Sequence, residues 1–132
     1  MKKDTLLTFH IVPKLKTDDY NIALFKCSGP SCMNEIARNK IKPIRVCFSW
    51  NTSHNCNTGL SSKQKDTTYM AQGIGVNVGP TYASALKVKA GETYYLLVNA
   101  NSVNLQDPEG FTIYFYNYLP KNKTNTYIFK TK

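Results

Sequence analysis

Short segments rich in β-branched and aromatic residues recur along the chain, several of them with apolar and polar residues in alternation. Side chains two positions apart on a β-strand point to the same face, so such segments predict half-buried strands. Polar turns containing Gly, Pro, Asn or Asp separate them. The expected strands are 5–12 (TLLTFHIV), 20–26 (YNIALFK), 44–50 (IRVCFSW), the glycine-containing and weaker 69–78, 84–89 (SALKVK), 93–99 (TYYLLVN), 110–118 (GFTIYFYNY) and 125–130 (NTYIFK).

About seven or eight short strands spaced by turns favour an all-β fold, an antiparallel β-sandwich or jelly roll, over βαβ units. The turn Ala90-Gly91-Glu92 predicts that segments 84–89 and 93–99 pair as a hairpin. At most one or two helical turns are expected, at 32–40. With 132 residues the chain is expected to form one domain over 1–132, its core at about 5–119 and 120–132 a tail or last strand.

The formal charge of +9 comes from 17 Lys and Arg against 8 Asp and Glu. A basic balance attracts nucleic acid, anionic lipid or acidic polysaccharide. The lysines are spread out, many in Lys-x-Lys pairs, which favours solvated faces and protected strand edges and leaves an anionic partner as the alternative. Only two arginines are present, which argues against specific nucleic-acid recognition. No run of 18 apolar residues occurs, so no transmembrane segment is predicted.

Four cysteines, Cys27, Cys32, Cys47 and Cys56, fall within thirty residues. They lie among turn residues and few charges, which favours disulfides in an oxidising compartment, and the local pairs Cys27–Cys32 and Cys47–Cys56 are expected. Buried thiols and a zinc site are the alternatives, although the eight residues between Cys47 and Cys56 are more than a zinc knuckle normally has. No signal peptide opens the chain, so an oxidised module is expected to be a fragment of a longer precursor.

A row of tyrosines is the candidate ligand-binding feature. On a strand, Tyr114, Tyr116 and Tyr118 share one face, and Phe111 and Phe115 point the opposite way with Ile113 as a credible core face. An exposed tyrosine row can stack on sugar rings or carry a protein contact. Cross-strand packing accounts for it equally well, so both interpretations stay open.

Carboxylates near strand-connecting loops are the candidate metal ligands. Asp18 and Asp19 open one strand, and Asp107 and Glu109 precede another. Together with nearby Asn side chains they could ligate Ca²⁺, which takes six to eight oxygens. Turn chemistry explains the aspartates equally well. No other cofactor is expected.

The sequence does not predict an enzyme. His10 lies inside a predicted strand, where a packed or edge-exposed side chain is expected. His54 lies in a loop two residues before Cys56, and a Cys–His nucleophile pair is conceivable there, but four clustered cysteines favour bridges. The glycines of 73–79 (GIGVNVG) do not have the nucleotide-loop spacing, and an irregular edge strand is expected instead.

In order along the chain, several short segments resemble the β-sandwich domains of secreted Bacteroidetes proteins, including gliding-motility-associated and type IX-secreted proteins. The segment VKAGETYYLLV is also similar to bacterial pre-peptidase C-terminal domains. The resembling segments are 7–13 (LTFHIVP), 18–25 (DDYNIALF), 27–29 (CSG), 44–47 (IRVC), 58–60 (TGL), 88–98 (VKAGETYYLLV) and 110–113 (GFTI).

The resemblance implies a non-catalytic extracellular accessory or adhesion module at the cell surface that binds protein or polysaccharide, and it implies no catalytic residues. Such domains usually begin with an earlier strand, and this sequence is expected to begin after it. If another chain supplies that strand, the exposed edge is expected to promote self-association. A structural spacer between an enzyme or adhesin and its anchor is the alternative function. A small Cys/His hydrolase is the second alternative.

Overall fold

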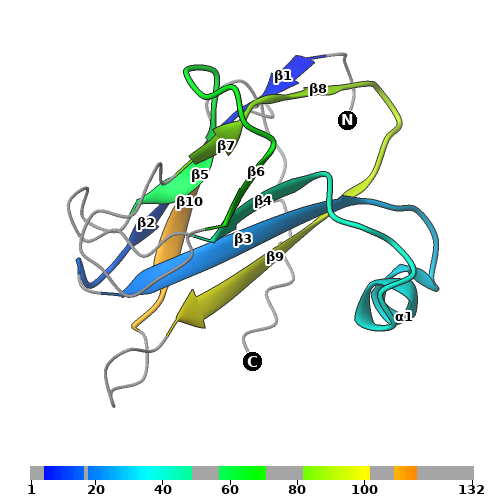
Figure 1. Ribbon diagram of the computed structural model, residues 1–132, viewed down its shortest axis with the longest axis horizontal. Helices are drawn as coiled ribbons and strands as arrows, with labels where there is room; N and C mark the ends of the chain where they lie inside the picture. Colours follow the sequence, from blue (N-terminus) through cyan, green and yellow to red (C-terminus); the bar gives the residue numbers. More distant parts are fainter. Residues whose placement is uncertain (1–4, 17, 49–56, 71–81, 102–108, 116–132) are drawn as a thin grey trace, which may run out of the picture.

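The computed structural model describes residues 5–16, 18–48, 57–70, 82–101 and 109–115. In this part of the chain ten β-strands and one short helix form (Figure 1). The strands are β1 (Thr5–Leu7), β2 (Phe9–Pro13), β3 (Asp19–Lys26), β4 (Arg45–Phe48), β5 (Thr58–Ser61), β6 (Thr68–Met70), β7 (Tyr82–Ser84), β8 (Leu86–Val88), β9 (Tyr94–Asn101) and β10 (Phe111–Phe115), and the helix is α1 (Cys32–Ala37).

The strands form two four-stranded sheets and a two-stranded extension. The first sheet has the order β10-β2-β5-β7, the second sheet has the order β6-β4-β3-β9, and β1 pairs with β8. The predicted all-β sandwich-like fold is confirmed, and so is the helical turn within 32–40. Most strand pairs are antiparallel, as expected, but β5 with β7 and β4 with β6 are parallel. No helix in the described residues is long and apolar enough to cross a membrane.

The core lies between the two sheets. Phe9 and Ile11 of β2 and Leu60 of β5 come from the first sheet, and Ile22 and Leu24 of β3 come from the second. All five are almost fully buried. Alternate residues of β2 and β10 point inward, and the predicted core face of β10, which is Phe111, Ile113 and Phe115, packs against this cluster. The period-two pattern therefore identified the correct inner face of β10.

Strand β3 is buried on both faces, which alternation alone does not predict. Its outward-facing Ala23 and Phe25 form a second cluster with Val46 of β4. Ile36 of α1 and Ile41 pack against this cluster. The helix therefore covers part of the outer face of the second sheet, and Figure 1 shows it beside the end of β3 and the start of β9.

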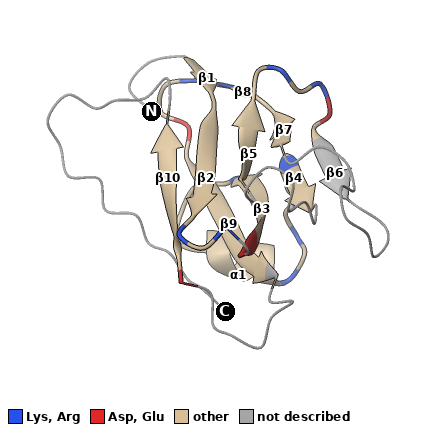
Figure 2. Ribbon diagram, turned by 90° about the vertical axis from the view of Figure 1, so that its left-hand side faces the viewer, with Lys and Arg blue, Asp and Glu red and all other residues tan. Residues whose placement is uncertain are grey.

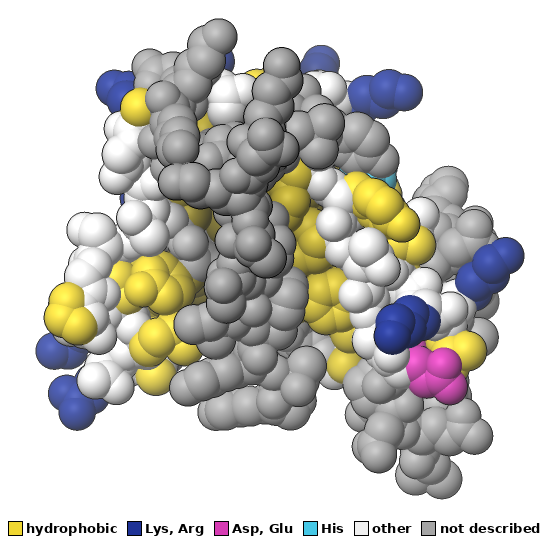
Figure 3. Space-filling model, turned by 180° about the vertical axis from the view of Figure 1, so that it is seen from behind, with side chains coloured by type: hydrophobic (Ala, Val, Ile, Leu, Met, Phe, Trp, Pro, Cys, Tyr) yellow, Lys and Arg dark blue, Asp and Glu magenta, His cyan; other side chains and the backbone are white. Residues whose placement is uncertain are grey.

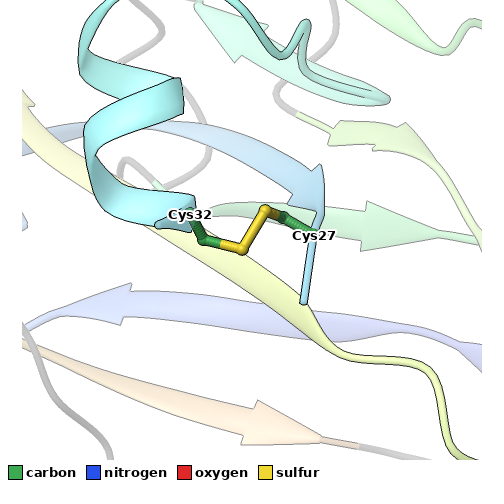
Figure 4. Close-up of a disulfide and its surroundings, with 2 residues drawn as sticks. All are labelled: Cys27 and Cys32. Carbon is green, nitrogen blue, oxygen red and sulfur yellow. A yellow bond between two sulfur atoms is a disulfide. The ribbon is translucent and has the colours of Figure 1, made fainter. Parts of the chain in front are cut away.

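A disulfide between Cys27 and Cys32 ties the end of β3 to the start of α1 (Figure 4). The two Cα atoms lie 5.9 Å apart, and Cys32 is completely buried. This confirms one of the two predicted pairs. Cys47 is buried in the core, and its predicted partner Cys56 lies outside the described residues. An intramolecular disulfide is typical of secreted and extracellular proteins.

Arg45 joins the two sheets at one edge of the sandwich. From β4 in the second sheet, its guanidinium donates to the carbonyl oxygens of Ser84 at 2.8 Å and Ala85 at 2.9 Å, where β7 of the first sheet ends and β8 begins. It also donates to the carbonyl of Ile44. Burial lowers the pKa of Arg45 from its usual value. The planar fork of arginine suits several carbonyls at once, so this arginine has a structural role.

The predicted hairpin of segments 84–89 and 93–99 is wrong. Strand β8 pairs with β1, whereas β9 pairs with β3 along its whole length in the second sheet. The turn does form, with Gly91 at φ 83°. Beyond it, however, the chain crosses from one side of the sandwich to the other. Nearest-neighbour pairing is the usual outcome of such a turn, but β9 instead pairs with β3, where its Val98 is buried in the core.

Glu92 holds this crossover in place. Its carboxylate accepts the backbone N–H of Lys89 at 2.8 Å, accepts the hydroxyl of Tyr94, and forms an ion pair with Lys26 at the end of β3. These donors, Lys26 first, lower the pKa of Glu92 to about 2. Burial and the neighbouring carboxylate raise the pKa of Tyr94 to about 12. The crossover is thus tied to both strands of the second sheet that it reaches.

Strands β2 and β5 lie unusually close together at Gly59. This glycine has φ 150°, and a Cβ built on it would lie 2.0 Å from the carbonyl oxygen of Phe9. No other residue fits there without moving one strand away from the other. Gly59 therefore fixes the spacing of the first sheet at its centre.

We expect Gly59→Ala to lower the free energy of unfolding by more than about 3 kcal/mol, because the methyl group collides with backbone rather than with a movable side chain. Gly91→Ala is the matched control, since Gly91 also has positive φ but has open space around the position of a Cβ. Its cost is the backbone strain alone, about 1–2 kcal/mol. Urea unfolding of the two variants measures the difference, and equal losses would contradict the close contact at Gly59.

Candidate functional site

The outer face of the first sheet carries the candidate site. In β1 and β2, Phe9 and Ile11 point into the core, so Leu6, Thr8 and His10 lie on the opposite face. Figure 2 looks onto this sheet, with β10, β2, β5 and β7 side by side and α1 behind them. The helix therefore does not cover this face.

Pairing register places four residues in one row across this face. Tyr114 of β10 pairs with His10 of β2, His10 pairs with Gly59 of β5, and Gly59 pairs with Tyr82 of β7. Directly paired residues point to the same face of a sheet. Because Gly59 has no side chain, the rings of His10 and Tyr82 meet above it with centroids 5.0 Å apart. Tyr114 continues the row and is 52% exposed.

An open groove of about 540 Å³ lies beside this row. One wall comes from β1 and β2, with Leu6, Thr8 and His10; the other comes from residues 60–64 at the end of β5 and in the loop after it, and from Tyr82. Hydroxyl, amide, imidazole and ammonium groups thus line the groove together with an aromatic ring. A small number of polar groups that converge on a partly apolar surface is typical of a ligand-binding site.

The loop that forms the second wall is fixed by backbone contacts. Gln64 N–H donates to the carbonyl of Ser61 at 3.2 Å, and Lys63 N–H donates to the Ser61 hydroxyl at 3.3 Å. The Ser61 carbonyl also accepts Ala85 N–H at 3.1 Å, which ties the loop to the β7–β8 junction. The groove therefore has two positioned walls, which lowers the ordering cost of binding.

His10 and Tyr82 form a hydrogen-bonded pair, with Tyr82 Oη and His10 Nδ1 2.9 Å apart. Burial lowers the pKa of His10 from 6.5, so the imidazole is neutral at pH 7. In the tautomer with its proton on Nε2, Nδ1 accepts the tyrosine hydroxyl. The pair then presents neutral polar groups beside an aromatic face.

The predicted tyrosine row is only partly within the described structure. Tyr114 is exposed on the outer face, whereas Tyr116 and Tyr118 lie outside the described residues. The alternation that placed Tyr114 opposite to Phe111 and Phe115 is confirmed.

The predicted calcium ligands are partly brought together. Asp18 accepts the backbone N–H of Glu109 at 2.9 Å, which places the two residues side by side. Asp19 is buried at the start of β3, and Asp107 lies outside the described residues. In the described ranges no three metal-ligating side chains converge. The calcium site stays a prediction.

The residues of the other candidate chemistries lie elsewhere. His54 and Cys56, the conceivable nucleophile pair, are outside the described residues, as is the glycine-rich 73–79. Every lysine in the described part of the chain is exposed, as expected for solvated faces. Seen from behind Figure 1, Lys and Arg side chains are distributed around the surface rather than gathered in one patch (Figure 3).

Sequence reasoning missed His10, Tyr82 and the loop at 60–64. Alternation within 5–12 does place His10 on the polar face of its strand, and this was the available signal. The partner strands of β2 are about fifty and a hundred residues away along the chain, and no local pattern specifies them.

Comparison of the chain with protein-family models, with curated proteins and with solved structures finds no match. The resemblance to secreted Bacteroidetes domains and to pre-peptidase C-terminal domains therefore stays a prediction.

We expect His10 to titrate below pH 6.5, because burial disfavours the imidazolium. The unfolded chain then binds this proton more tightly than the folded protein, so the free energy of unfolding falls as the pH drops below 6.5. An NMR titration of the imidazole ring signals measures the pKa of His10. The His10→Gln variant shows which of these signals belong to His10 and which belong to His54. The variant should also lose this part of the acid sensitivity in urea unfolding. A His10 pKa at or above 6.5 would contradict the partly buried His10–Tyr82 pair.

Proposed function

We propose that the chain is a non-catalytic accessory or adhesion module of a secreted or cell-surface bacterial protein, and that it binds glycan through the groove beside His10 and Tyr82. The observation that carries the proposal is the row of Tyr114, His10 and Tyr82 on the outer face of the first sheet, in which His10 and Tyr82 line an open groove. The expectation of a protein or glycan ligand is thereby narrowed to a sugar.

The chemistry of the groove supports a sugar. One face of a pyranose ring is apolar and packs on aromatic side chains, while its hydroxyls need donors and acceptors in the ring plane. Tyr82 and Tyr114 supply aromatic faces, and Ser61, Ser62 and Gln64 supply polar groups at the groove. An open groove also accommodates a chain that continues at both ends, as in a polysaccharide.

The disulfide supports the extracellular part of the proposal. Cys27–Cys32 closes a loop of a few residues beside α1, and such bridges persist in oxidising compartments and are rare in the cytosol. The gliding-motility and type IX-secretion assignments rest on the resemblance alone.

The first test is a glycan array probed with the wild-type chain, followed by calorimetry on the best ligand. We expect Tyr82→Ala and Tyr114→Ala each to weaken binding by about tenfold, since each removes an aromatic face. Tyr82→Phe keeps the ring and removes only the hydroxyl that meets His10, so its loss should be smaller.

Phe48→Ala is the matched control, because Phe48 is an exposed aromatic residue on β4 of the other sheet. It should bind as the wild type does. A wild-type chain that retains no glycan would contradict the proposal and favour the spacer. Equal losses of glycan affinity in the tyrosine variants and in the Phe48 variant would place the binding site elsewhere.

The second test concerns the oxidised state. Lys26 and Arg38 flank the two cysteines, so trypsin releases residues 27–38 as one peptide. From the native protein, digested without reductant, we expect this peptide two hydrogen atoms lighter than after reduction. A fully reduced peptide from freshly isolated protein would remove the argument for an extracellular location.

A further inference from the structure

We infer that the groove selects an acidic polysaccharide, one whose sugar units carry carboxylate or sulfate groups, through Lys63 and Lys87. The inference rests on the proposed glycan function and adds the charge of the ligand. It follows from where two lysines lie relative to the aromatic row, and not from the net charge of the chain.

Lys63 lies in the wall of the groove itself. Its backbone N–H donates to the Ser61 hydroxyl, so the turn that carries it is fixed, while its side chain is exposed. An ammonium group on a fixed turn can reach a ligand in the groove and stay solvated when the groove is empty.

Lys87 lies on the same face, on β8 beside the wall that β1 and β2 form. In the pairing of β1 with β8, Lys87 lies directly opposite Leu6, and Leu6 lines the groove. Directly paired residues share a face, so Lys87 is on the groove side of the extension, and it is exposed. Figure 2 shows basic residues at the end of the first sheet where β1 pairs with β8 and where the loop after β5 begins.

The described carboxylates do not offset these two charges. None of them lines the groove. Glu92 is ion-paired with Lys26, and Asp18 accepts a backbone N–H from Glu109 near the opposite end of β2. Along the chain, the carboxylate nearest to Lys63 is that of Asp66, which follows Lys65 in the same loop. His10 is neutral at pH 7, so the positive potential in the groove comes from the lysines.

Lysine, unlike arginine, carries a point charge without a planar fork. A pair of lysines therefore attracts carboxylate and sulfate alike and does not discriminate between them by geometry. The aromatic row then supplies the preference for a sugar ring over any other anion. A ligand of the groove therefore needs an anionic group close to the sugar ring that stacks on the aromatic row.

The test compares polysaccharides that differ only in charge. Polygalacturonate and its fully methyl-esterified form share one backbone, and dextran sulfate and dextran share another. Binding of the wild-type chain to all four is measured by biolayer interferometry at low and high salt. We expect both acidic polymers to bind at least about tenfold more tightly than their neutral partners. The difference should shrink as salt shortens the screening length below about 10 Å.

The double variant Lys63→Gln/Lys87→Gln should weaken binding to the acidic polymers by about tenfold, and each single variant by about threefold. The control is Lys40→Gln/Lys42→Gln, which removes the same charge from exposed positions next to α1 on the other side of the sandwich. It should bind almost as the wild type does. Equal losses in the two double variants would overturn the inference, because the attraction would then come from net charge.

Other outcomes separate this inference from the function on which it rests. Equal binding to a neutral polymer and its acidic counterpart, sensitive to Tyr82→Ala, would overturn the anionic preference and leave the glycan-binding module standing. Absence of binding to all four polymers and to a glycan array would overturn both. Binding to only one acidic polymer would support the inference and identify carboxylate or sulfate as the group recognised.

Discussion

The close passage of β5 against β2 at Gly59 is the contact on which the first sheet and its outer face depend. The Phe9 carbonyl occupies the place where any other residue would carry its Cβ, so the two strands cannot keep this spacing with a larger residue. The same absence of a side chain lets the rings of His10 and Tyr82 meet across β5. Gly59 thus sets the spacing between β2 and β5 within the sheet, and it also lets the side chains of His10 and Tyr82 meet on the outer face.

The two faces of the sandwich are used differently. On the second sheet, α1 and Ile41 cover Ala23 and Phe25, and the disulfide holds the start of that helix against the end of β3. The outer face of the first sheet is where the described polar and aromatic side chains converge on a groove. The covered sheet makes the sandwich rigid, and the uncovered face of the other sheet can serve as a binding surface.

Local features of the sequence were sufficient for most of the described strands, the fold class, the helical turn and the pair Cys27–Cys32, because each of them depends on residues close together in the chain. Strand β5 (Thr58–Ser61) was not among the expected strands, because its short segment TGLS lies in a polar stretch without an apolar alternation. Strand partners were not predictable in this way. The turn around Gly91 has the composition of a hairpin, yet its two strands belong to different sheets. The groove was missed for the same reason, since His10 and Tyr82 are 72 residues apart and only the register of three strands brings them together.

Strand β2 has neighbours from distant parts of the chain, β5 on one side and β10 on the other. Loop closure over such distances costs entropy before any contact repays it, so folds of this kind assemble slowly. During synthesis, the first sheet cannot be completed until residue 115 has left the ribosome, although β2 is made about a hundred residues earlier. Until β10 arrives, one edge of β2 has no partner strand, so the nascent chain carries an open apolar strand edge that has to be shielded.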